Sequence, residues 1–116
     1  MSFEDLDVWK RAARLSAEIY KNTNQLRDYG FRDQLARSGL SVPSNIAEGM
    51  TRVSAKEQCR FLEISRSSLA EARTQIYIGI EIGYLPDTVA KPWLQETKEI
   101  AAIISGLMHS IMQKNK

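Results

Sequence analysis

Apolar residues recur at helical spacing along four segments of the chain, and short polar, glycine- or proline-containing segments separate them. In the first segment, for example, Val8, Ala12, Leu15 and Ile19 fall on one side of a helix, with charged residues opposite. The expected helices cover residues 6–23, 31–50 and 54–83, and a fourth segment that begins at Asp87, at Thr88 or near Pro92. Four amphipathic helices joined by short turns predict an all-α fold, an up-down-up-down four-helix bundle, formed by one domain over residues 1–116.

The third expected helix has clear start and stop signals. Ser54 and Glu57 have the spacing of a capping box, and Gly83 suits the position just after a helix end. One segment within it is ambiguous, because isoleucines alternate over residues 76–82 as they would in a strand. No other segment offers a partner strand, and a lone strand leaves its backbone groups unpaired. We therefore expect the helix to continue through this segment.

The second expected helix is apolar over most of its circumference between residues 37 and 49. Its two apolar rows are Leu35, Gly39, Val42 and Ile46, and Ala36, Leu40, Pro43 and Ala47. A bundle buries about one stripe per helix, so the surplus apolar surface predicts a subunit interface. A narrow polar stripe remains, formed by Arg37, Ser41, Asn45 and Glu48.

Two interpretations of this polar stripe stay open. In the first, it is structural and makes hydrogen bonds to another helix or another subunit. In the second, Arg37, Asn45 and Glu48 form a polar site. We favour the structural interpretation, because buried Arg and Glu usually pair with each other. It predicts that Arg37, Asn45 and Glu48 are at least partly buried and hydrogen-bonded.

Charge gives a second set of candidate residues. The chain has 16 Lys and Arg against 14 Asp and Glu, and its net charge of +2 does not by itself imply a polyanionic partner. Its cations are nevertheless grouped in two rows that could follow phosphates, although the residues alone favour the alternative given below. The rows are Arg52, Lys56 and Arg60, and Lys10, Arg14 and Lys21. The alternative is a pair of solvated faces with interspersed acids, such as Glu57, Glu63 and Glu18.

The residue types needed for catalysis or metal binding are scarce. His109 is the single histidine and Cys59 the single cysteine, so an intrachain disulfide is impossible and a structural zinc site is not expected. No glycine-rich phosphate loop is present. We therefore expect no catalytic, cofactor or metal site, and no enzyme. The single cysteine, the acidic N-terminal residues and the lack of a long apolar run predict a cytoplasmic protein without a membrane span.

Several motifs resemble one family, the small bacterial four-helix-bundle proteins encoded in intervening sequences of large-subunit ribosomal RNA genes. The most specific of them is the segment Val42-Pro43-Ser44-Asn45-Ile46-Ala47-Glu48-Gly49. The others are Phe3-Glu4-Asp5-Leu6 with Trp9, Arg60-Phe61-Leu62, Ser65-Arg66, Ser68-Leu69-Ala70-Glu71 and Gly83-Tyr84-Leu85. The resemblance implies a four-helix bundle that assembles into a homopentameric ring and has no established enzymatic activity.

The accessory variability proteins of diversity-generating retroelements look similar in fold. They bind nucleic acid and a reverse transcriptase through a basic surface, and they are more strongly basic than this chain. Two hypotheses about function follow from the residues and the resemblance together. The protein is either an oligomer that binds RNA or DNA, or an oligomeric scaffold for a protein partner. Neither hypothesis involves a membrane.

Overall fold

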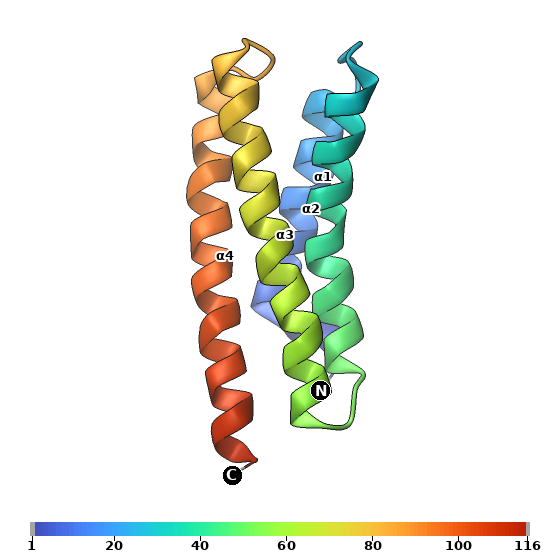
Figure 1. Cartoon of the computed structure of the whole chain (residues 1–116), viewed down its shortest axis with the longest axis vertical. Coiled ribbons are helices and arrows are strands. Elements are labelled where there is room, and N and C mark those ends of the chain that lie inside the picture. Colours follow the sequence, from blue (N-terminus) through green and yellow to red (C-terminus); the bar gives the residue numbers. More distant parts are fainter. Residues whose placement is uncertain (1, 116) are drawn as a thin grey trace.

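The computed structural model describes residues 2–115, which form a short 3-10 helix and four long α-helices. The elements are η1 (Phe3–Asp5), α1 (Asp7–Thr23), α2 (Tyr29–Met50), α3 (Ala55–Glu81) and α4 (Asp87–Lys114). Successive helices run alternately up and down, and the N-terminus lies near the turn between α2 and α3 (Figure 1). The described part of the chain contains no strand. The predicted all-α, up-down-up-down bundle is confirmed.

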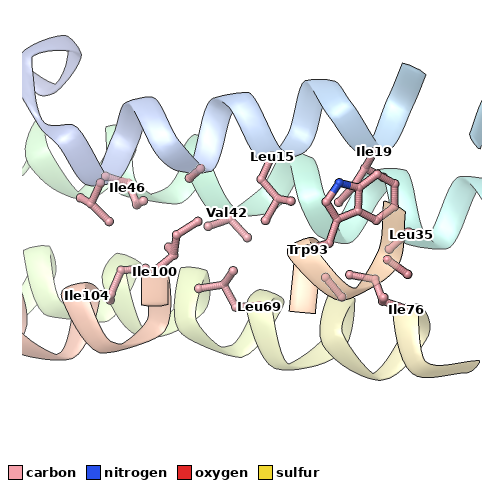
Figure 2. Packing of buried hydrophobic residues seen from close by; sticks show 14 of the residues in the cluster. Leu15, Ile19, Leu35, Val42, Ile46, Leu69, Ile76, Trp93, Ile100 and Ile104 are labelled. Carbon is pink, nitrogen blue, oxygen red and sulfur yellow. The ribbon is translucent and has the colours of Figure 1, made fainter. Parts of the chain in front are cut away.

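One hydrophobic core runs along the bundle axis and takes residues from all four helices. Leu15 of α1, Val42 of α2 and Leu69 of α3 lie at one level of this core, and Ile19, Leu35, Ile76 and Trp93 lie together further along the bundle (Figure 2). The first apolar row of α2 is fully buried, as its spacing predicted. In α3 and α4, Leu62, Leu69, Ile76, Ile100 and Ile104 are buried too, whereas Phe61, Ile80, Leu107, Met108 and Ile111 are only half-buried.

The ends of α3 match their sequence signals. The Ser54 hydroxyl accepts a hydrogen bond from the backbone N–H of Glu57 at 3.1 Å. At the other end Gly83 has a φ of +80°, and the N–H groups of Gly83 and Tyr84 donate to the carbonyls of Ile80 and Gly79. This pattern is a Schellman motif, which satisfies carbonyls that a helix end leaves unpaired. Residues 76–81 are helical, so the choice of helix over strand is confirmed.

The helix starts differ from expectation at α2. This helix begins at Tyr29, two residues before the expected start at Phe31, because Asp28 caps it. One Asp28 oxygen accepts from the N–H of Phe31 at 3.1 Å, and the other accepts from the phenol of Tyr84 at 3.0 Å. The hydrogen bond to Asp28 raises the pKa of Tyr84. Helix α4 begins at Asp87, the earliest of the three expected starts.

Helices α2 and α3 are joined through small and hydroxyl side chains. The Ser65 hydroxyl donates to the carbonyl of Val42 at 2.9 Å, and the hydroxyls of Ser41 and Ser68 lie 2.8 Å apart. Near the end of α2, a methyl group on Gly49 would come within 3.1 Å of both the Gln58 carbonyl and the Phe61 Cβ. These contacts hold the turn between the two helices in one geometry.

Among residues 2–115, no helix combines the length and the apolar character that crossing a membrane requires.

Candidate nucleic-acid interface

The first basic row, here called the α1 row, consists of Lys10, Arg14 and Lys21. All three side chains are exposed, and helical spacing places them on the side of α1 away from the core residues. Among the described residues, no ion pair includes any of the three. The α1 row therefore keeps three cations outside ion pairs on an exposed face, with Glu18 and Glu96 lining the same hollow as Arg14.

The second basic row, here called the turn row, consists of Arg52, Lys56 and Arg60 at the junction of α2 and α3. Arg52 pairs with Glu48 across one helical turn, and the Arg60 guanidinium lies 3.0 Å from the Glu57 carboxylate. The hydrogen bond from Arg60 lowers the pKa of Glu57, and the nearby charges of the row lower it further. Two of the three charges in the turn row are therefore compensated locally.

The turn row also has a packing role. The guanidinium carbons of Arg52 and Arg60 lie over the Phe61 ring, 4.7 and 4.6 Å from its centroid. In addition, the Gln58 side-chain amide donates to the carbonyl of Arg52 at 3.0 Å. Cations placed over an aromatic face are attracted to it, so the three side chains stabilise one another. The turn row can therefore stabilise the turn between α2 and α3 as well as contact a partner.

The polar stripe of α2 is only partly buried. Ser41 and Asn45 are half-buried, and the Asn45 amide donates to the backbone carbonyl and hydroxyl of Ser41 at 2.8 and 3.0 Å. Arg37 and Glu48 are exposed, so their predicted burial is wrong for the single chain. Arg37 lines an open hollow between α2 and α3 together with Ser41, Ser68 and Glu71, and Glu48 pairs with Arg52 near the end of α2, so both side chains stay exposed to solvent. A role for them at a subunit contact stays a prediction.

An apolar groove, here called the α1–α2 groove, lies on the outer face of these two helices. It encloses about 510 Å³ and its surface is almost entirely apolar. The lining residues are Phe3, Trp9, Ala13, Ser16, Ala17, Tyr20, Leu40, Pro43, Ser44 and Ala47. Three of them belong to the second apolar row of α2, which was the sequence signal for surplus apolar surface. The contributions of Phe3 and Tyr20 were missed, because the groove exists only once α1 and α2 are side by side.

A cluster of ion pairs, here called the charged clamp, joins α1 to α4. Sequence spacing did not predict it, because Arg11 and Glu96 are 85 positions apart. The Arg11 guanidinium lies 3.0 Å from one Glu96 oxygen and 2.7 Å from the Glu99 carboxylate. These bonds raise the pKa of Arg11, and the bond from Arg11 lowers that of Glu99. A hollow of about 250 Å³ borders the clamp, lined by residues of both helices. Arg11 is thus a structural cation and does not extend the α1 row outward.

The titratable residues give no metal-ligand cluster among residues 2–115. Cys59 is half-buried, with its sulfur 3.7 Å from the Met108 carbonyl, and burial raises the pKa of its thiol. A raised pKa leaves less thiolate at neutral pH, so this cysteine has the character of a packed side chain.

Comparison with known proteins places this geometry in a family. The family model described as 23S rRNA-intervening sequence protein matches residues 4–106. A crystal structure of a protein of unknown function from the S23 ribosomal protein family of Bacteroides thetaiotaomicron has the same fold, with a TM-score of 0.81. The two chains are 20% identical, and the match covers 87% of this chain and 97% of that one. No curated protein matches the chain. The chain therefore belongs to the 23S rRNA-intervening sequence protein family.

Proposed function

We propose that this protein is a non-enzymatic, cytoplasmic homo-oligomer that binds RNA or other nucleic acid through basic residues repeated around the assembly. The uncompensated α1 row is the observation that carries the proposal. Lysine and arginine that neutralise phosphates release bound counterions, and this release drives binding without sequence preference. A ring would present several copies of the row, so multivalent contacts would raise avidity even though the net charge per chain is modest.

Exposed isoleucines on α3 support the proposed self-association. Ile64 and Ile78 of α3 and Ile82, which directly follows this helix, are each more than one-third exposed, and helical spacing puts Ile64 and Ile78 on one side of α3. Large apolar side chains that face solvent are often part of a subunit contact. The family resemblance suggests five subunits in a closed ring, which requires a heterologous contact between neighbours.

A second candidate function is an oligomeric scaffold for a protein partner. The observation that favours it is that most arginines already form ion pairs with carboxylates. A nucleic-acid phosphate would have to displace the carboxylate before it could pair with such an arginine. The arginines paired with carboxylates are Arg11, Arg32, Arg52, Arg60 and Arg66. On this hypothesis the assembly is retained and nucleic-acid binding is weak.

Light scattering coupled to size-exclusion chromatography tests the assembly. At micromolar concentration we expect a mass several times that of the 13.2 kDa chain. A mass equal to one chain would rule out the proposed oligomer. Repeating the measurement with cellular RNA would show a further mass increase if the assembly binds it.

A salt titration with fluorescent RNA tests nucleic-acid binding. We expect log K to fall linearly with log salt, by about 0.7 for each single-strand phosphate neutralised. The triple reversal Lys10→Glu, Arg14→Glu and Lys21→Glu should weaken binding while light scattering reports an unchanged mass. Absence of binding by the parent protein at about 50 mM salt, where counterion release is strong, would favour the protein-scaffold function instead.

A further inference from the structure

The α1 row and the α1–α2 groove share an edge of α1. Ala17 lies between Arg14 and Lys21 at the spacing of the row, and it also lines the groove. Ala13, which also lines the groove, is three positions from Lys10, and Trp9 and Tyr20 supply aromatic rings to the groove. An apolar, aromatic hollow is therefore bordered along one side by the row of uncompensated cations.

Tyr20 is the most accessible aromatic ring of this region. It is 46% exposed, and it borders two further hollows besides the groove, of about 180 and 190 Å³. Arg32 lines the first of these hollows and Arg37 lines the second, and Asp33, which pairs with Arg32, lines both. The ring thus stands on the surface with open space around it and cations nearby, which is unlike the packed setting of Phe61 in the turn row.

This combination of groups fits one class of ligand. Single-stranded nucleic acids are bound by cations that follow the phosphates together with aromatic side chains on which bases stack. Duplexes keep their base faces stacked inside, so they can use the cations but not the aromatic rings. We propose that the α1–α2 groove takes bases of a single-stranded nucleic acid whose phosphates lie along Lys10, Arg14 and Lys21; this rests on the proposed function.

The length of the α1 row suits a short stretch of single-stranded nucleic acid. Lys10 and Lys21 are 11 residues apart on α1, which corresponds to about 16 Å along the helix axis. Stacking and phosphate contacts do not involve the 2′-hydroxyl, which is the group that distinguishes RNA from DNA. The surface therefore selects single strands over duplexes and accepts RNA and DNA of equal length alike.

Substitutions at Tyr20 test the base contact separately from the charge contact. The probes are a fluorescein-labelled uridine 12-mer, a thymidine 12-mer and a 12-base-pair DNA duplex, followed by anisotropy at low salt. Tyr20→Leu keeps an apolar side chain and removes the ring, and we expect single-strand binding to weaken about tenfold with duplex binding unchanged. Tyr20→Phe keeps the ring and should bind within about twofold of the parent. Tyr77→Leu on α3 is the matched control, since Tyr77 is similarly exposed at 49% and should have no effect.

The outcomes separate this inference from the proposed function. If Tyr20→Leu leaves single-strand affinity unchanged while reversal of the α1 row abolishes binding, the function stands and the base contact is wrong. If Tyr20→Leu changes the mass measured by light scattering, the groove holds a second copy of the chain and the inference is also wrong. If the parent binds neither single strands nor duplex, the proposed function itself fails.

Discussion

The α1 row and the turn row have the same kinds of side chain at similar helical spacing, yet their surroundings differ. In the turn row, Glu48 and Glu57 pair with two of the three cations, and both paired guanidinium groups lie over the Phe61 ring. In the α1 row, the neighbours toward the groove are alanines and aromatic residues; Glu18 and Glu96 border Arg14 on the other side, but no described carboxylate forms an ion pair with the row. The comparison shows that a basic row becomes a binding surface or a structural element according to its neighbours.

The comparison predicts different salt responses when each row is reversed. Reversing the α1 row with Lys10→Glu, Arg14→Glu and Lys21→Glu removes three free charges and should lower the salt slope of binding by about 2. Reversing Arg52, Lys56 and Arg60 should lower it by only about 0.7, because Lys56 is the uncompensated member. Anisotropy titrations with a single-stranded oligonucleotide measure both slopes. Equal losses would show that local pairing does not decide which row binds.

The packing role of the turn row predicts an effect on stability. Phe61→Ala removes a half-buried ring that lies beneath two guanidinium groups, so the free energy of unfolding should fall by about 2 kcal/mol. Tyr77→Ala, which removes an exposed ring, should change it by no more than about 0.5 kcal/mol. Urea unfolding followed by circular dichroism measures both. A similar loss of unfolding free energy in the two variants would show that Phe61 stabilises the fold no more than an exposed ring does.

Removing the carboxylates that pair with Arg52 and Arg60 should make the turn row bind nucleic acid as the α1 row is proposed to do. Glu48→Gln with Glu57→Gln removes the partners of Arg52 and Arg60, so the salt slope should rise by up to about 1.4. Glu63→Gln, which frees Arg66 on a different face, is the control and should leave oligonucleotide binding nearly unchanged. A double variant that binds like the parent would mean that the turn row lies away from the nucleic acid.

The smallest effect concerns pH. Because Arg60 lowers the pKa of Glu57 below its ordinary value of 4.5, the carboxylate stays charged above that pH and the pair is intact. The pair's contribution to stability is lost only as the pH falls through the lowered pKa. The ion pair between Arg60 and Glu57 should therefore stay intact between about pH 5 and 8. An NMR titration of the Glu57 carboxyl checks this, with Arg60→Gln expected to return its pKa toward 4.5.

The parts of the structure that could be predicted depend on neighbours close in sequence. The cap at Ser54, the Schellman motif at Gly83 and the buried rows follow from residues one to four positions apart. Contacts between distant helices could not be found this way: the Arg11–Glu96 clamp joins residues 85 positions apart. The groove was missed for the same reason. The ion pair between Arg52 and Glu48 could have been predicted, since the two residues are four positions apart. It was not predicted, because Glu48 was expected to be buried in the polar stripe.

The two hydrogen bonds at Asp28 have a consequence for the order of folding. Tyr84 lies 56 positions from Asp28, so their bond joins the loop before α2 to the loop before α4. Closing so long a segment costs chain entropy before any contact compensates for it, whereas the α2–α3 hairpin forms from nearby residues. We therefore expect the α2–α3 hairpin to form early and the Asp28–Tyr84 contact to form late. In thermal motion the bundle should then open first at the end where those two loops meet.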